Sequence, residues 1–227
     1  MNPAEFDLFA DAYEQQHACN IRLSGETPAY FSRYKVQDVV KLCTQQPTRI
    51  LDFGAGVGTS IPHWHEAFPQ ARLTCLDVSQ RSLAIANACH PDTADYCIFD
   101  GSRLPFASDS FDVAFAACVF HHIAAEHHPP LLSELHRILC KGGQLFVFEH
   151  NPLNPLTRHA VNTCPFDANA ELILAHTMRD RLRDAGFAQL SLAYRIFFPG
   201  ALSILRPLER MLTRLPLGAQ YRLQAQK

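Results

Sequence analysis

The sequence has no long hydrophobic run: no apolar stretch reaches the ~18 residues needed to cross a bilayer, so we expect no membrane span. None of its eight cysteines forms a C-x-x-C pair, which removes the usual zinc and redox couples. The first eleven residues carry acidic side chains and no basic one, unlike a signal or transit peptide. We therefore expect a protein of the reducing cytoplasm whose thiols are buried as small hydrophobic groups.

A basic excess is also missing. The formal net charge is −2, whereas domains dedicated to nucleic acid are strongly basic, so we expect no nucleic-acid partner. The charge is uneven along the chain, however. Residues 178–227 hold nine basic and three acidic side chains, and this basic region needs its own explanation.

Part of the basic region is a cationic, leucine-rich stretch at residues 201–215. Arg206, Arg210 and Arg214 are spaced four apart, which places them roughly on one face of a helix. We expect the leucines to pack on the domain and the arginines to lie in water. The alternative is an amphipathic helix that contacts an anionic membrane surface or a phosphorylated acceptor.

What the 227 residues do contain is a regular alternation of strand-like and helix-like segments. Strands are predicted at residues 49–53, 72–77, 96–99, 111–120, 144–148, 190–198 and 219–225, and helices at 59–68, 80–89, 131–139 and 168–185. Such alternation is typical of βαβ units, so we predict an α/β protein with a doubly wound, mostly parallel seven-stranded sheet and helices on both faces. A mostly helical segment over residues 1–46 precedes the sheet, and an insertion over residues 199–218 precedes its last strand.

The most informative string runs from Ile50 to Gly58. An apolar strand enters three glycines at alternate positions, Gly54, Gly56 and Gly58, and a helix is predicted to follow. Glycine allows positive φ and a close approach of the backbone to a ligand, and a helix N-terminus favours negative charge. The pattern predicts a nucleotide-like ligand at the carboxyl end of the strand. A dinucleotide fingerprint would need glycine at position 59, where this chain has Thr59.

Carboxylates follow the next two predicted strands. Asp77 ends the second strand, where an acid can hydrogen-bond both ribose hydroxyls. The alternative for Asp77 is a helix N-cap, a role for which Ser79 competes. Asp100 follows the third strand, where it can accept from an adenine amino group or simply make a turn. The glycine loop and the two acids thus come in chain order, each at a strand end.

With these features the sequence resembles the class I S-adenosylmethionine-dependent methyltransferases, in particular those of type 11. The matching strings are Ile50–Gly58, Leu76–Val78, Phe99–Gly101, Leu104–Phe106, Phe111–His122 and Leu139–Gly143. The resemblance covers residues 45–150. It implies a Rossmann-like methyltransferase fold, with S-adenosylmethionine as the cofactor and S-adenosylhomocysteine as the product.

The resemblance also implies a role for each matching position. The cofactor-binding residues would be Asp52, Gly54, Ala55, Gly56, Asp77, Val78, Asp100, Gly101 and Ala117. The glycine loop would lie against the methionine part, with Asp52 supporting that loop or the amino group. Asp77 would hold the ribose, while Val78 and Asp100 would meet the adenine. Ala117 would offer only its backbone, because family members often carry a polar side chain there.

His121 and His122 stand where the fourth predicted strand ends, which in this family faces the cofactor's methyl group. A hydroxyl acceptor has to lose its proton, and histidine has the pKa of a base near neutral pH. Several small-molecule O-methyltransferases of the family carry a His pair here and an acid after the fifth strand, matched by Glu149 and His150. We predict that His121 or His122 is the base, helped by Glu149 or His150. Neighbours along a strand point to opposite faces, so if the strand geometry persists this far, only one histidine of the pair can face the pocket.

Segments around this centre have expected roles too. A stiff loop with two Asn-Pro steps is predicted over residues 151–158, where it can cover an acceptor. In related methyltransferases the segment before the first strand is a lid, here residues 1–46, over a catalytic domain of residues 47–227. The histidines clustered between positions 121 and 128 do not have a usual zinc spacing, so we predict no metal.

These features together predict an S-adenosylmethionine-dependent methyltransferase that acts on a small molecule. A hydroxyl oxygen is the expected acceptor atom, and nitrogen and carbon acceptors stay open. The alternatives are an NAD(P)-dependent oxidoreductase of Rossmann type and a cofactor-binding partner subunit without a catalytic role.

Overall fold

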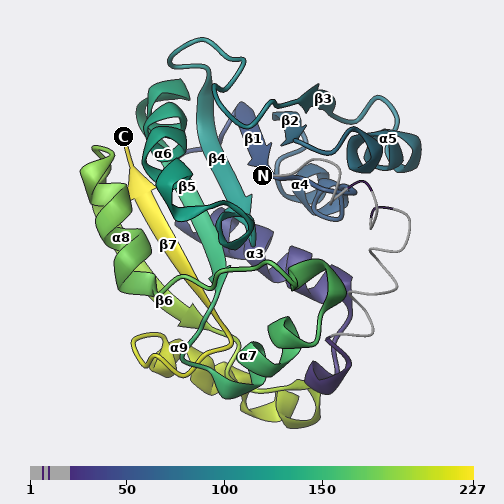
Figure 1. Ribbon diagram of the computed structural model, residues 1–227, viewed down its shortest axis with the longest axis vertical. Helices are drawn as coiled ribbons and strands as arrows, with labels where there is room; N and C mark the ends of the chain where they lie inside the picture. Colours follow the sequence, from purple (N-terminus) through teal and green to yellow (C-terminus); the bar gives the residue numbers. More distant parts are fainter. Residues whose placement is uncertain (1–6, 8–9, 11–20) are drawn as a thin grey trace.

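A seven-stranded sheet forms the centre of the computed structural model, which describes Asp7, Ala10 and residues 21–227 (Figure 1). The strands are β1 (Arg49–Phe53), β2 (Arg72–Asp77), β3 (Asp95–Ile98), β4 (Phe111–Ala117), β5 (Leu139–His150), β6 (Ala188–Arg195) and β7 (Gln220–Gln226). Their order is β3-β2-β1-β4-β5-β7-β6, and β7 runs antiparallel to both β5 and β6. The remaining pairs are parallel, so the predicted doubly wound, mostly parallel sheet is confirmed.

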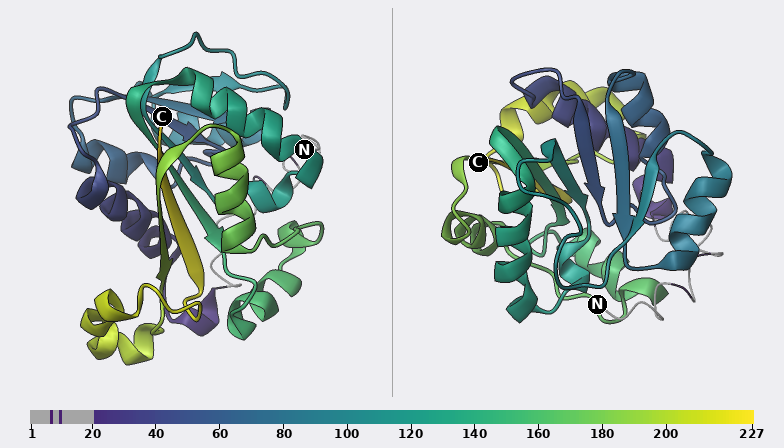
Figure 2. Two further views of the ribbon diagram at one scale, coloured as in Figure 1. Left: turned by 90° about the vertical axis from the view of Figure 1, so that its left-hand side faces the viewer. Right: turned by 90° about the horizontal axis from the view of Figure 1, so that it is seen from above.

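Helices cover both faces of this sheet (Figure 2). They are α3 (Pro28–Leu42), α4 (Ile61–Ala67), α5 (Gln80–Cys89), α6 (His128–Ile138), α7 (Pro155–Asn162), α8 (Ala175–Asp184) and α9 (Glu209–Leu212), with 3-10 turns η2 (Arg22–Ser24), η3 (Phe120–His122), η4 (Ala125–His127), η5 (Pro165–Asp167) and η6 (Gly200–Leu208). The buried residues fall into two clusters, one with α3, α4 and α5 and the other with α6 and α8. Each cluster fills the layer on one face of the sheet.

Successive side chains of a strand point to opposite faces, so each central strand contributes alternate residues to the two layers. In β4, Val113 and Phe115 belong to the layer with α3 to α5, whereas Ala114 and Ala116 belong to the layer with α6 and α8. This division explains why the strand is a continuous apolar run, since both of its faces are covered.

Aromatic rings fix α3 and α4 to the sheet. Trp64 of α4 meets Phe115 edge to face with ring centroids 5.1 Å apart, and Tyr34 of α3 meets Phe148 in the same way at 6.1 Å. All four side chains are buried. Aromatic pairs of this kind add to the burial of large apolar surfaces, so α3 is held firmly beside the carboxyl ends of β4 and β5.

β4 ends three residues earlier than its apolar run predicts. The run continues to Phe120, but Cys118 has a positive φ of 60°, which turns the chain out of the strand. The residues Phe120–His122 then form η3. This early end sets the direction of the two histidines.

β5 is longer than predicted, because it takes in the glycines that were expected only to end the preceding helix. Its pairing with β4 shifts between Phe111 and Val113, and Gly142 has a positive φ of 80°. The extra residues therefore form a bulge at the start of the strand.

The predicted loop over residues 151–158 contains the start of a helix. The side chain of Asn154 accepts a hydrogen bond from the backbone N–H of Thr157, and Pro155 occupies the first helical position of α7. The second Asn-Pro step therefore begins a helix and does not continue the loop. Pro155 is tolerated there because the first residue of a helix needs no N–H donor.

The predicted helix over residues 168–185 begins only at Ala175. The residues before it pass along the histidines, where the Glu171 N–H donates to the His121 carbonyl at 2.8 Å. The Glu171 N–H is therefore bonded to a carbonyl outside its own segment and is not available for a helical hydrogen bond.

The stretch after β6 does not pack as expected. η6 and α9 contain no buried residue, and Ile204 and Met211 are 86% and 82% exposed. The expectation that the leucines of residues 201–215 pack on the domain is therefore wrong for Leu202, Leu208 and Leu215, which are between 45% and 49% exposed, whereas Leu205 and Leu212 are half-buried. Pro207 and the non-helical Leu202 break the stretch, so no continuous apolar stripe can turn toward the sheet.

Candidate active site

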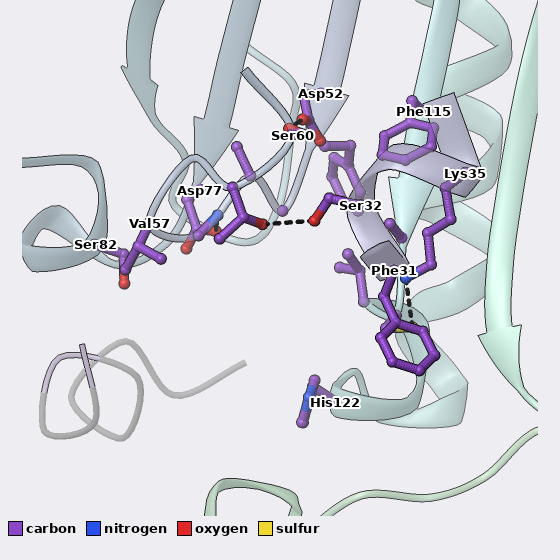
Figure 3. A pocket seen from close by; sticks show the side chains of 18 of the residues that line it. Phe31, Ser32, Lys35, Asp52, Val57, Ser60, Asp77, Ser82, Phe115 and His122 are labelled. Carbon is purple, nitrogen blue, oxygen red and sulfur yellow. Dashed lines mark hydrogen bonds between the residues drawn. The ribbon is translucent and has the colours of Figure 1, made fainter. Parts of the chain in front are cut away.

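A cavity lies at the carboxyl ends of β1, β2 and β4, the edge at which open α/β sheets bind ligands (Figure 3). The predicted site residues that line it are Asp52, Gly54, Ala55, Gly56, Asp77, Val78, Ala117, His121, His122 and His150. Asp100 and Gly101 are absent from this lining, although Phe99 just before them belongs to it. The structure thus brings the predicted cofactor residues and the histidines into one space.

The three glycines of the loop differ in what they allow. A Cβ on Gly54 would lie 2.4 Å from Val119 Cγ2, and one on Gly58 would lie 2.9 Å from the Cβ of Ala86. These two glycines are therefore required for packing. A Cβ on Gly56, whose φ is 54°, would meet no atom within 4 Å. Gly56 presents bare backbone to open space, as expected where a ligand approaches the chain closely.

Asp77 faces the glycine loop from the end of β2. Its Oδ2 accepts from the Gly56 N–H at 2.8 Å, and its Oδ1 accepts from the Ser79 N–H at 2.9 Å. Ser79 takes the capping role, because its hydroxyl accepts from the Ser82 N–H at the start of α5. Burial raises the pKa of Asp77, and the backbone hydrogen bonds oppose that increase. Each carboxylate oxygen has further acceptor capacity for a ribose hydroxyl.

Asp52 supports the loop from β1. Its side chain is 2% exposed and accepts from the Ser60 hydroxyl and from Trp64 Nε1, the latter at 3.4 Å. Burial raises the Asp52 pKa to about 6 despite these hydrogen bonds. Because both partners lie at or in α4, the contacts join β1 to the helix that follows the loop. They favour the supporting role among the two roles predicted for Asp52.

Asp100 makes a local turn. It is exposed, and its Oδ1 accepts from the Ser102 N–H at 2.9 Å and from the Ser102 hydroxyl at 2.7 Å. Gly101 follows with a φ of 89°. The turn that was the alternative reading of Asp100 is thus present, and the adenine contacts of both residues stay predictions, as does the backbone contact of Ala117.

A buried carboxylate organises the end of β4. Glu149 of β5 accepts at Oε1 from the backbone N–H groups of Val119 and Phe120, at 3.1 and 2.8 Å. Its Oε2 lies 2.5 Å from His121 Nδ1, and both side chains are 1% exposed. Glu149 therefore fixes both the start of η3 and the ring orientation of His121.

Asp167 reaches both histidines from η5. Its Oδ1 lies 3.7 Å from His121 Nε2 and 3.4 Å from His122 Nε2. Both histidines line the cavity, because Phe120–His122 have left the strand and the condition for only one of them to face the pocket is not met. His150 stands beside them, with its ring centroid 5.1 Å from that of His121.

The two histidines are driven to opposite charge states. Burial disfavours the His121 cation, but the carboxylates of Glu149 and Asp167 outweigh burial and raise its pKa above the ordinary value. Burial and then the charged His121 ring lower the pKa of His122. These directions favour the charged form of His121 and the neutral form of His122.

The same cluster has a spacing that a metal ion could use. Ligand atoms of His121, His122 and Asp167 all lie within 4.8 Å of one another. The absence of a metal from this cluster therefore stays a prediction from the sequence.

A pair in the cavity wall was missed by the sequence reasoning. Lys35 of α3 is 7% exposed, and its Nζ lies 3.3 Å from Cys118 Sγ (Figure 3). Burial opposes ionisation of the Cys118 thiol, but Lys35 and His150 outweigh burial and lower its pKa to about 7. The available signal was a lysine on the buried stripe of a helix, four residues from both Phe31 and Val39. Such a buried cation can bind a ligand carboxylate.

The family described as "Methyltransferase domain" matches residues 51–147. Residues 51–147 of this chain therefore belong to the class I S-adenosylmethionine-dependent methyltransferase family. The chain is 30% identical over 122 residues to the demethylmenaquinone methyltransferase of Chlamydia muridarum, and the match covers 50% of this chain and 52% of that protein. It is 33% identical over 101 residues to the malonyl-[acyl-carrier protein] O-methyltransferase of Methylococcus capsulatus, covering 44% of this chain and 36% of that protein.

Solved structures agree with the methyltransferase fold. An S-adenosylmethionine-dependent methyltransferase from Thermotoga maritima superposes with a TM-score of 0.70 at 20% identity, covering 99% of both chains. A likeness at this identity shows the fold alone. The methyltransferase chain spans between 20% and 52% of the first curated relatives it matches. Among the described residues, no helix has the length and apolar character to cross a membrane.

Proposed function

We propose that this chain transfers a methyl group from S-adenosylmethionine to a hydroxyl oxygen of a small molecule. The observation that carries the proposal is a histidine–carboxylate pair in the cavity wall, in which His122 Nε2 lies 3.4 Å from Asp167 Oδ1. A hydroxyl is a weak nucleophile until a base removes its proton. A neutral amine needs no such base, so a histidine–carboxylate pair in the cavity wall favours the hydroxyl.

The cavity wall fits S-adenosylmethionine along its length. Asp77 offers carboxylate oxygens beside the bare backbone of Gly56, as a ribose requires. Val78 and Phe99 line the cavity with apolar surface suited to adenine. Lys35 offers a buried cation for the methionine carboxylate. When bound, the cofactor supplies an electrophilic methyl group on a sulfonium and departs as S-adenosylhomocysteine.

The chain's own residues would prepare the acceptor. His122 takes the hydroxyl proton, and Asp167 orients its ring and stabilises the imidazolium that results. His121 stays charged between Glu149 and Asp167 and acts as a positioning residue for the Asp167 carboxylate. His150 lines the same wall and offers the acceptor a second polar contact.

A carbon acceptor is the second candidate. It is favoured by the similarity to proteins named demethylmenaquinone methyltransferases, from Chlamydia muridarum and Thermotoga maritima. A phenolate spreads its negative charge over oxygen and ring carbons, so the same base serves either atom. Alignment of the acceptor in the cavity then selects the atom that receives the methyl group.

Isothermal titration with S-adenosylmethionine, S-adenosylhomocysteine and NADH tests the cofactor assignment. The proposal expects binding of the first two ligands, loss of that binding in Asp77→Ala, and no binding of NADH. Binding of NADH in place of S-adenosylmethionine would instead establish the oxidoreductase alternative.

Transfer from radiolabelled S-adenosylmethionine to a panel of phenols, alcohols and amines tests the acceptor and the base. His122→Ala is expected to lower kcat by about 100- to 10,000-fold. His127→Ala, which removes an exposed histidine of the same segment, is the matched control. Unchanged turnover in His122→Ala would contradict the base. Cofactor binding without transfer to any acceptor would favour the partner-subunit alternative.

A further inference from the structure

Exposed apolar side chains gather at one end of the molecule. Among the described residues, eight of the ten exposed large hydrophobic side chains lie in residues 153–156 and 202–217. Ile204, Met211 and Leu156 are the most exposed, at 86%, 82% and 70%. Single exposed hydrophobic residues are ordinary, but a contiguous group of them marks an interaction surface.

The two segments form one surface, called here the apolar end and defined as residues 153–156 and 202–217. Asn151 Nδ2 donates to the Gly218 carbonyl at 2.8 Å, and Asn154 Nδ2 donates to the Leu217 carbonyl at 2.7 Å. Figures 1 and 2 place η6, α9 and α7 at the same end of the molecule, beyond the carboxyl ends of the parallel strands. The apolar side chains are thus held together by hydrogen bonds between the segments.

Positive charge accompanies this apolar surface. Arg158, Arg210 and Arg214 are exposed, and none of them forms an ion pair with a described residue. The acidic residue within the apolar end is Glu209, whose Oε1 accepts from the backbone N–H groups at positions 197 and 198. Arg206 is neutralised separately by Glu26. Glu209 offsets one of the two charges of Arg210 and Arg214, and Arg158 beside the apolar end adds another, so the surface with its edge carries a small excess of positive charge.

The apolar end adjoins the cavity through α7, which contributes to both. Ala160 and Val161 of α7 line the cavity beside the histidines. Leu156 of the same short helix belongs to the exposed surface. Whatever covers the apolar end therefore lies beside the part of the cavity wall that α7 forms.

We propose that the apolar end is a docking surface for an anionic lipid bilayer. The exposed leucine, isoleucine and methionine side chains enter the boundary between headgroups and acyl chains, and the three arginines contact lipid phosphates. A bilayer meets both requirements at once, because it offers apolar volume under a negatively charged plane. The protein then binds at the membrane surface with the side of the cavity that α7 lines turned toward the lipid.

Flotation of the full chain with lipid vesicles tests this proposal. The wild type is expected to float with vesicles that contain phosphatidylglycerol at low salt, more weakly at high salt, and least with phosphatidylcholine alone. Arg210→Glu with Arg214→Glu is expected to weaken vesicle binding by about fivefold or more for each charge removed. Ile204→Ser with Met211→Ser is expected to abolish flotation. Ile98→Ser, which changes an exposed apolar side chain far along the sheet, is the matched control and is expected to float normally.

Several results would overturn the proposal. They are failure of the wild type to float with anionic vesicles, equal loss of flotation in Ile98→Ser, and unchanged flotation in both double variants. A dimer that Ile204→Ser with Met211→Ser dissociates, seen by light scattering without vesicles, would assign the apolar end to a second copy instead. Titration with S-adenosylhomocysteine checks that each variant is folded. Because flotation does not depend on methyl transfer, failure of the proposed enzyme activity and failure of membrane docking are separately visible.

Discussion

His121 and His122 are neighbours in sequence and lie against the same carboxylate, yet they carry different charges. His121 has a second carboxylate, Glu149, at 2.5 Å from its other ring nitrogen. Two anions beside a buried imidazole raise the His121 pKa, whereas burial and then the charged His121 ring lower the His122 pKa. The contact with Glu149 thus distinguishes two otherwise identical side chains.

This difference is measurable by NMR without any acceptor. The His122 ring should stay neutral as pH falls through about 6.5, the ordinary histidine value, because its pKa is lowered. The His121 ring should stay charged as pH rises through the same value, because its pKa is raised. Ring carbon shifts of the two histidines, recorded against pH, give the result. A His122 shift with a midpoint near the ordinary value would contradict the assignment.

Cys118 should be the thiol that alkylates at neutral pH. Its pKa is lowered to about 7, so the reactive thiolate should accumulate as pH rises through that value. Lys35→Met should move the midpoint upward, and S-adenosylhomocysteine should protect the thiol. Site-resolved mass spectrometry after iodoacetamide treatment measures both effects. Cys43 serves as an internal control, because burial raises its pKa to about 12. Equal labelling of the two cysteines at neutral pH would refute this expectation.

In the glycine loop, Gly56 is expected to matter mainly for ligand binding and Gly54 mainly for the stability of the fold. Gly56→Ala places a methyl group in open space at positive φ, so we expect a modest loss of about 1 kcal/mol in stability and a larger loss in S-adenosylmethionine affinity. Gly54→Ala drives the same methyl group to 2.4 Å from Val119, and should cost more than about 2 kcal/mol of stability. Urea unfolding and titration calorimetry on both variants distinguish these outcomes. Equal stability losses would mean that the loop relaxes around Gly54.

Local sequence patterns predicted the strands and the loop, but not where β4 ends. The apolar run continues past Ala117 to Phe120, and no neighbour in sequence shows that Cys118 adopts a positive φ. The partners that fix this turn are remote: Lys35 contacts the thiol, and Glu149 binds the following N–H groups. The orientation of the histidines therefore depends on tertiary contacts that a periodicity argument does not contain.

The polar residues of the site follow the same rule. The cofactor residues lie at strand ends in chain order, so motif and topology together predict their meeting place. Asp167 and Lys35 come from helical segments outside the recognised motif, and only the folded chain shows that they face the same cavity.

At the scale of the whole molecule, ligand binding should raise the unfolding temperature. S-adenosylhomocysteine at about 100 times its Kd stabilises the folded state by ~2.7 kcal/mol, which is roughly 5–10 °C for a chain of this size. Thermal denaturation with and without ligand measures the shift. We expect Asp77→Ala to lose it and Ile98→Ser to keep it. An identical shift with NADH would show that the stabilisation is not specific.

The antiparallel β7 also constrains the order in which the chain can fold. It lies between β5 and β6, and β6 has β7 as its neighbour in the sheet, although β6 precedes it in the sequence. During synthesis on the ribosome, β5 therefore shows an open edge until residues 220–226 emerge, and β6 has nothing to pair with. Tyr221 and Leu223, both fully buried, then complete the core in a late step. An exposed edge of this kind attracts other chains, so this is the stage at which a nascent chain is most exposed to aggregation and to the action of chaperones.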